Sequence, residues 1–112
     1  LPNLGVSNTI RAAVAAWAKT LANEIGPFGI TVNNVLPGST YTGRLEALMK
    51  QRAQTDGQSI DEVEERMKSA IPLKRIGQPE EIANVVAFLA SPAASYVSGV
   101  NIPVDGGKTP SI

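Results

Sequence analysis

Apolar positions in the first quarter of the chain predict one long helix. Between Ser7 and Ile25 the large apolar residues recur at steps of three or four, which places them on a single helical stripe: Ile10, Val14, Trp17, Leu21 and Ile25. Alanines fill the other faces and would let a second helix approach closely, so we expect this helix to pack on two sides. Gly26-Pro27 predicts its end, because glycine adopts the left-handed cap conformation and proline cannot continue the hydrogen-bond ladder.

Two short stretches have the composition of strands. Residues 30–36 are rich in β-branched side chains and are followed by Pro37-Gly38, while residues 100–104 end at Asp105-Gly106-Gly107. Pro103 indicates that the second strand lies at an edge. Between them, Pro79 is suited to the first position of a helix. The predicted buried face of that helix consists of Ile82, Val85, Val86 and Leu89.

The charged middle of the chain, residues 40–70, splits at Thr55-Asp56-Gly57 into two short helical patterns. Ser59 and Glu62 have the spacing of a capping box at the start of the second. The resulting alternation of helices and strands is typical of an α/β fold with a parallel sheet. Only two strands are visible, and a parallel sheet needs neighbours and two covered faces. The sequence therefore predicts an incomplete fold.

Composition narrows the function classes. The chain has 112 residues, of which 43% are hydrophobic and 18% charged, as in one soluble globular domain. Ten basic residues balance ten acidic ones, so we expect a small-molecule partner rather than nucleic acid or a membrane. No apolar run is long enough to span a bilayer, which by default predicts a cytoplasmic protein. Without cysteine or histidine we expect no metal site, and chemistry must use hydroxyls, Lys, Arg, carboxylates or a bound cofactor.

Two long segments carry a family resemblance. They read RAAVAAWAKTLANEIGPFGITVNNVLPGSTYT and IPLKRIGQPEEIANVVAFLASPAASYVSGVNIPVDGG. Together they resemble the short-chain dehydrogenase/reductase family, in particular its 3-oxoacyl-acyl-carrier-protein reductases. The resemblance implies that residues 1–112 form the C-terminal half of a doubly wound, Rossmann-like parallel sheet. It also implies that residues 40–70 are a helical excursion that covers the substrate.

The activity implied by the resemblance is oxidoreduction. Hydride would pass between a nicotinamide cofactor, NAD or NADP, and a carbonyl or hydroxyl substrate, such as a 3-oxoacyl thioester. The family's Gly-rich phosphate loop, Asn-Ala-Gly segment and catalytic serine do not occur within these residues. Because the pyrophosphate of a dinucleotide is held at that Gly-rich helix N-terminus, we expect this chain alone to bind the cofactor weakly or not at all.

The turn after the first strand matches the family's nicotinamide-binding loop. The resemblance implies that Gly38, after Pro37, lets the backbone approach the cofactor, and that amides near Ser39 and Thr40 meet the carboxamide. Thr42 matches a threonine whose hydroxyl contacts the cofactor. Taken alone, Pro-Gly is a generic turn dipeptide and Thr42 is an ordinary helix cap.

The family's catalytic Tyr-x-x-x-Lys pair is replaced in this chain. Counting along the match puts Ser7 at the tyrosine and Arg11 at the lysine position, one helical turn apart. Arg11 could still bind a ribose, but a serine hydroxyl is a poor proton donor. The alternative is therefore a non-catalytic relative that keeps the fold for binding or assembly. Tyr41 could replace the missing phenol, although packing is the interpretation that we favour, and Asn33 is expected to tie backbone segments together.

Self-association is the last expectation from the resemblance. The first helix, and the last helix and strand, correspond to subunit interfaces in the family. Exposed apolar faces on these elements would drive the formation of a homo-oligomer.

Overall fold

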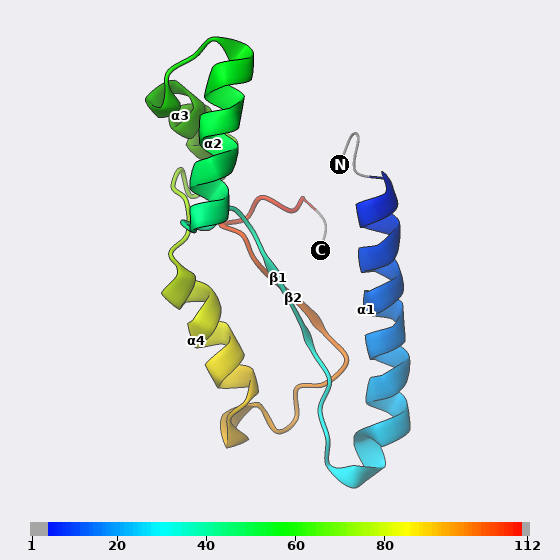
Figure 1. Cartoon of the computed structure of the whole chain (residues 1–112). Helices are drawn as coiled ribbons and strands as arrows, with labels where there is room; N and C mark the ends of the chain where they lie inside the picture. The colour runs from blue at the N-terminus through cyan, green and yellow to red at the C-terminus, as the bar shows by residue number, and fades with distance from the viewer. Residues whose placement is uncertain (1–4, 111–112) are drawn as a thin grey trace. The chain divides into compact units, whose positions relative to one another are not determined.

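The computed structural model describes residues 5–110, and its helices and strands alternate as the sequence predicts (Figure 1). The elements in chain order are α1 (Gly5–Ile25), η1 (Gly26–Phe28), β1 (Asn34–Pro37), α2 (Gly43–Asp56), α3 (Ile60–Ser69), α4 (Pro79–Leu89), η2 (Pro92–Ala94) and β2 (Asn101–Val104). This order confirms the predicted α/β class of helix, strand, helical excursion, helix and strand. No helix in the described part of the chain is both long and apolar enough to cross a membrane.

The chain forms two compact units, each built from two stretches of sequence. Within the described residues, unit 1 comprises 5–35 and 86–102, and unit 2 comprises 36–85 and 103–110. Strands β1 and β2 and helix α4 each contribute residues to both units.

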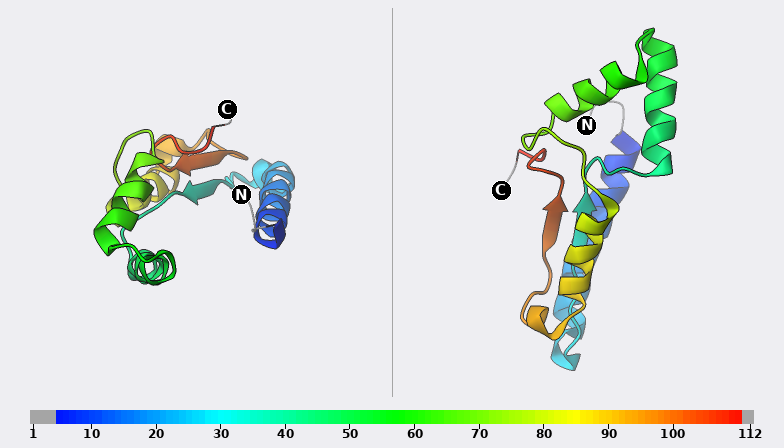
Figure 2. Two further views of the ribbon diagram at one scale, coloured as in Figure 1. Left: turned by 90° about the horizontal axis from the view of Figure 1, so that it is seen from above. Right: turned by 90° about the vertical axis from the view of Figure 1, so that its left-hand side faces the viewer.

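Strands β1 and β2 are hydrogen-bonded neighbours that run side by side (Figure 2). The Asn34 amide donates to the Val100 carbonyl at 2.9 Å, and the Gly38 amide donates to the Val104 carbonyl at 2.9 Å. From the first bond to the second, the donor and the acceptor both lie further toward the C-terminus, so the two strands are parallel. The second strand matches its prediction to within one residue. The first strand is shorter than predicted, because before Asn34 the chain meets its neighbour through loop contacts instead of a ladder.

Asn33 provides some of these loop contacts. Its Nδ2 donates to the Val97 carbonyl at 2.9 Å, and its Oδ1 accepts from the Val100 amide at 3.3 Å. The side chain is half-buried. The interpretation of Asn33 as an amide that ties backbone segments together is confirmed.

Helix α1 confirms the predicted helix but not its predicted packing. The buried residues of α1 are Ala18 and Ala22, whereas Ile10, Val14 and Trp17 are 59%, 49% and 63% exposed. The expectation of two packed sides is therefore wrong for residues 5–110. A helical stripe is buried only where other residues cover it. In the described part of unit 1 this stripe is open at Ile10, Val14 and Trp17, whereas Leu21 and Ile25 are half-buried.

Helix boundaries mostly follow the predicted signals. Ser59 Oγ accepts from the Glu62 amide at 3.1 Å and Glu62 Oε2 accepts from the Ser59 amide at 2.9 Å, which confirms the capping box. Pro79 begins α4 as predicted. The left-handed glycine after α1 is Gly29, with φ 73°, and not Gly26, because residues 26–28 add a 3₁₀ turn before the chain reverses.

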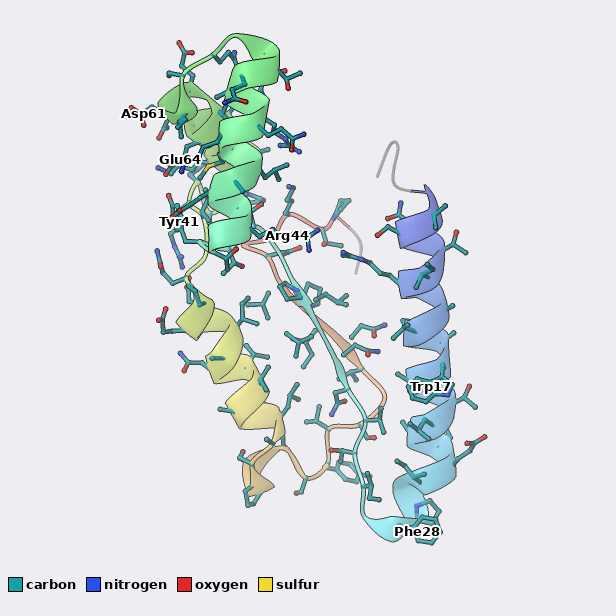
Figure 3. The ribbon with its side chains drawn as sticks, in the orientation of Figure 1. Trp17, Phe28, Tyr41, Arg44, Asp61 and Glu64 are labelled. Carbon is teal, nitrogen blue, oxygen red and sulfur yellow. The ribbon has the colours of Figure 1, made fainter. Side chains whose placement is uncertain are left out.

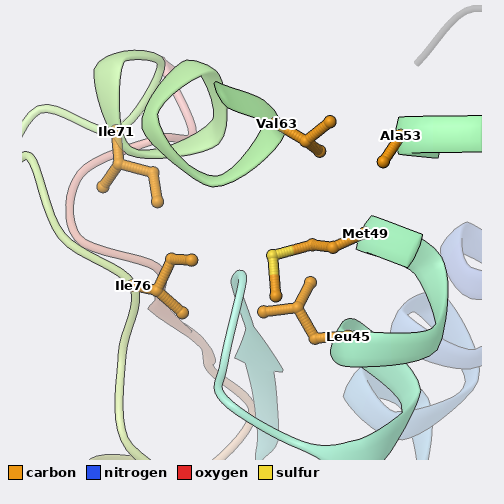
Figure 4. Close-up of a cluster of buried hydrophobic side chains, with 6 residues drawn as sticks. All are labelled: Leu45, Met49, Ala53, Val63, Ile71 and Ile76. Atoms are coloured by element: carbon orange, nitrogen blue, oxygen red, sulfur yellow. The ribbon is translucent and has the colours of Figure 1, made fainter. Parts of the chain in front are cut away.

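The core of unit 2 is formed largely by the charged middle of the chain (Figure 4). Its buried members are Leu45, Met49 and Ala53 of α2, Val63 of α3, and Ile71 and Ile76 from the segment that follows. Tyr41 and Met67 are partly buried and pack against this cluster. The segment predicted to cover a substrate is thus also the main source of hydrophobic packing in unit 2.

Helix α4 does not bury the face that its sequence predicts. Ile82, Val85 and Leu89 are half-buried, and Val86 is 49% exposed. The prediction for Val86 is wrong. Like Val14 of α1, this side chain stays about half exposed among the described residues.

Candidate functional site

The carboxyl ends of both strands meet in unit 2. Strand β1 ends at Pro37 and β2 ends at Val104, and the two loops that follow are joined by the bond from the Gly38 amide to the Val104 carbonyl. In open α/β sheets, ligands bind outside the carboxyl ends of parallel strands. This edge of the sheet is therefore the candidate site.

Gly38 lies in close contact with the second strand. A Cβ atom at this position would lie 2.6 Å from both Cα and Cβ of Asp105, well inside ordinary carbon–carbon contact. The family resemblance implies that Gly38 makes room for a cofactor. The packing adds an independent reason, because no side chain fits between the two loops.

The loop after Gly38 is fixed through two of its carbonyls and the Tyr41 amide, and it leaves two amides open. The Gly77 amide donates to the Ser39 carbonyl at 3.0 Å, and the Tyr41 amide donates to the Gly77 carbonyl at 2.9 Å. Thr40 Oγ1 donates to the Gly38 carbonyl at 3.1 Å. Among the described residues, the amides of Ser39 and Thr40 have no hydrogen-bond partner. They are two adjacent backbone donors available to a ligand.

Thr42 acts as the N-cap of α2. Its Oγ1 accepts from the Leu45 amide at 3.3 Å. The hydroxyl hydrogen is still free to donate, because capping uses only an oxygen lone pair. The helix-cap role of Thr42 is thus observed, and its contact with a cofactor stays a prediction.

A pocket of about 210 Å³ opens beside this loop within unit 2. Its lining includes Ser39, Arg75, Gly77, Glu81 and the turn 105–107. Ligand pockets usually measure about 300–1,000 Å³. The pocket therefore suits one end of a ligand and is too small for a whole dinucleotide.

The two charges beside the pocket neutralise each other. Arg75 donates to both carboxylate oxygens of Glu81, at 2.7 and 2.6 Å, and Glu81 also accepts from the Gln78 amide at 2.8 Å. Arg75, followed by the Gln78 amide, lowers the pKa of Glu81 to about 2, and Glu81 raises the pKa of Arg75. This pair fixes the start of α4 and offers no free acid or base.

Asp105 organises the turn on the opposite wall. Its carboxylate accepts from the Gly107 amide at 2.9 Å and from the amide and hydroxyl of Thr109 at 2.8 and 2.5 Å. The Thr109 hydroxyl is the main reason that the pKa of Asp105 lies below its usual value. Gly106 and Gly107 have φ values of 67° and 85°, which side chains rarely adopt. From the sequence this turn was predicted only as the end of a strand. The adjacent pair Gly106-Gly107 could have indicated its left-handed backbone.

Tyr41 is engaged by a neighbouring helix. Its hydroxyl donates to a carboxylate oxygen of Glu64 on α3, and the two side chains lie close together in Figure 3. This hydrogen bond is the main reason that the pKa of Tyr41 is raised. A phenol with a raised pKa is a weaker acid, so the arrangement favours packing over proton donation.

Ser7 and Arg11 both lie on α1 in unit 1. Ser7 is half-buried and Arg11 exposed, one turn further along. The structure thus groups the predicted site residues into a helical pair in unit 1 and the loop of Pro37, Gly38, Ser39, Thr40 and Thr42. The strand bearing this loop begins in unit 1, and its residues after Val35, together with the loop, belong to unit 2. Within residues 5–110, no three His, Cys, Asp or Glu side chains are grouped so as to hold a metal ion.

A family model described as enoyl-(acyl carrier protein) reductase matches residues 1–109. The chain belongs to the short-chain dehydrogenase/reductase family. This membership confirms the resemblance of the two long segments. The two parallel strands, together with the helices, are part of a Rossmann-like α/β fold.

Named relatives show how much of such a protein the chain covers. It is 46% identical over 99 residues to cyclohexanol dehydrogenase of Rhodococcus sp. strain TK6, covering 88% of this chain and 33% of that protein. It is 39% identical over 107 residues to 3-oxoacyl-(acyl-carrier-protein) reductase FabG of Aquifex aeolicus, covering 94% and 39%. The crystal structure of YwfH, an NADPH-dependent reductase involved in bacilysin biosynthesis, is 35% identical with a TM-score of 0.90, covering 98% and 42%. The chain spans about two fifths or less of these relatives.

Proposed function

We propose that this chain supplies the nicotinamide-side wall of an oxidoreductase site, in which hydride passes between NAD or NADP and a carbonyl or hydroxyl substrate. The observation that carries the proposal is the pair of open amides at Ser39 and Thr40, at the carboxyl end of a parallel strand. A nicotinamide carboxamide has an acceptor oxygen for such amides and an NH₂ group that donates. NADPH dependence in the related YwfH supports the cofactor class.

The rest of the cofactor requires residues outside this sequence. The pocket is small, and no Gly-rich phosphate loop occurs in residues 1–112. We therefore propose that residues 1–112 are the C-terminal part of a single domain. Phosphate-binding residues outside this sequence would complete the site, and this chain alone would bind dinucleotide weakly.

The chain's own residues would orient the cofactor instead of performing the proton transfer. Bound nicotinamide supplies the hydride. The loop amides hold the carboxamide, and Arg11 offers a fixed positive charge for the ribose. Ser7 is too weak an acid, and the phenol of Tyr41 is occupied by Glu64. We therefore propose that the proton donor is a residue outside this sequence.

The test uses the protein expressed from its complete gene. It is mixed with NADPH or NADH and a panel of ketones, 3-oxoacyl thioesters and alcohols, and the absorbance of the reduced cofactor is followed. We expect turnover with at least one substrate, and Arg11→Gln should raise KM for the cofactor. Arg52→Gln, an exposed arginine on α2, is the matched control. No cofactor oxidation or reduction with any substrate would refute the proposal.

A second candidate is a non-catalytic relative that binds or assembles. Ser7 and Arg11 favour it, because the tyrosine and lysine expected at these positions are absent. Changing Ser7→Tyr together with Arg11→Lys should then create activity. Brisk turnover by the unmodified protein would exclude this candidate.

We also propose that the protein is a homo-oligomer. The exposed stripe on α1 supports this, with Val6, Ile10 and Trp17 at 77%, 59% and 63% exposure. In sedimentation the protein should behave as an oligomer, and Trp17→Glu should weaken the association of its subunits. A monodisperse wild-type monomer at working concentration would contradict the idea.

A further inference from the structure

We propose that Tyr41 is a positioning residue that couples helix α3 to the loop 38–42, so that local opening of α3 loosens the amides of Ser39 and Thr40. The nature of the ligand at these amides rests on the proposed function. The coupling itself rests on contacts within unit 2.

The backbone of Tyr41 belongs to the loop. Its amide donates to the Gly77 carbonyl at 2.9 Å, and Gly77 in turn donates to the Ser39 carbonyl at 3.0 Å. The residue before Tyr41 carries one of the two open amides, and the residue after it caps α2. Any displacement of Tyr41 is therefore transmitted directly to the candidate site.

The side chain of Tyr41 belongs to the packing of α3. Its hydroxyl donates to Glu64, which lies 23 positions further along the chain (Figure 3). Glu64 is also paired with Lys68 one turn later, at 2.8 Å, and Lys68 reaches Glu65 at 3.2 Å. The ring packs against the hydrophobic core of unit 2. Tyr41 thus reaches α3 directly through its bond to Glu64, and its ring packs on the core to which Val63 of α3 belongs.

Helix α3 depends on such contacts for its stability. It has ten residues, and isolated helices shorter than about 12–15 residues are marginal in water. Its one buried side chain is Val63. Besides Val63, the partly buried Met67, the ion pair of Arg66 with Asp56 and the Tyr41 bond to Glu64 link the helix to the rest of unit 2. The loss of one of these contacts should shift its local opening equilibrium.

Hydrogen exchange tests the coupling without reference to activity. The variants Tyr41→Phe and Glu64→Gln are compared with Tyr96→Phe, which alters a fully exposed phenol, and Glu65→Gln, which keeps the Tyr41 contact. In the first two variants, exchange should rise both in residues 60–69 and at the Tyr41 and Gly77 amides, whose hydrogen bonds hold the loop. The expected rise is about two- to fivefold for a partly exposed charged contact. The two controls should match the wild type. Faster exchange in α3 alone, or in neither segment, would overturn the coupling.

Kinetics of the protein from the complete gene provide the second measurement. Tyr41→Phe should raise KM for the nicotinamide cofactor by a similar factor and leave kcat nearly unchanged. A collapse of kcat would instead make Tyr41 the proton donor, and an unchanged KM in an active protein would also refute a positioning role. If the wild type processes no cofactor, the proposed function fails, and hydrogen exchange alone decides the coupling.

Discussion

Replacing Gly38 with alanine should destabilise the junction between the two strand ends. The added methyl carbon would lie 2.6 Å from Cα and Cβ of Asp105, whereas carbon atoms normally approach no closer than about 3.5 Å. One of the clashing atoms is backbone and the other is its first side-chain carbon, so neither can rotate away. The two loops must separate, and this strains the bond from the Gly38 amide to the Val104 carbonyl.

The magnitude follows from three contributions. Overpacking costs about 1–3 kcal/mol, and a strained or lost hydrogen bond adds about 0.5–1.5 kcal/mol. Alanine offsets about 0.4–1 kcal/mol of this loss, because it lowers the conformational entropy of the unfolded chain. The net loss in free energy of unfolding is about 2–3 kcal/mol, which corresponds to a fall in Tm of roughly 10–20 °C for a domain of this size.

Thermal unfolding followed by circular dichroism measures this loss, and Gly43→Ala is the matched control. Gly43 is the first residue of α2, and a Cβ there would meet nothing within 4 Å. Alanine at Gly43 should be neutral or stabilising by up to about 1 kcal/mol, because it favours the helix. Equal Tm values for the two variants would show that the close approach to Asp105 is wrong.

Three further predictions concern unit 2. Glu81, whose pKa Arg75 lowers from 4.5 to about 2, stabilises the folded state while ionised, so this contribution is full above pH 4.5 and disappears as the pH falls through about 2. Between pH 2 and 4.5, the free energy of unfolding measured in urea should depend less on pH in Glu81→Gln than in the wild type. Identical pH dependence would contradict the pairing of Glu81 with Arg75. The raised pKa of Tyr41, caused mainly by its bond to Glu64, predicts that Glu64→Gln moves its phenol titration to lower pH in ultraviolet absorbance; no movement would count against the bond. Ile71→Ala should cost about 2–5 kcal/mol in chemical denaturation, because Ile71 is 2% exposed and its removal leaves a cavity, whereas a loss below about 1 kcal/mol would place Ile71 outside the core.

Local signals were sufficient for the elements and for some of their boundaries. The capping box at Ser59 and Glu62 and the start of α4 at Pro79 depend on hydrogen bonds or backbone limits within a few residues, so the sequence alone determined them. Family membership was also readable from the order and spacing of two long segments. The candidate loop at Gly38 was proposed in this way, although the contact with Asp105 that requires its glycine was not.

Contacts between distant segments could only be seen in the tertiary structure. The approach of Asp105 to Gly38, the bond of Tyr41 to Glu64 and the Gly77 bridge each join residues far apart in sequence, and no local pattern encodes such pairings. Burial was also misjudged for the same reason. Periodicity placed Ile10, Val14 and Trp17 on one helical stripe, but a stripe records only which side chains share a face. Whether that face is covered depends on which other segments reach it. Only the tertiary structure decided this.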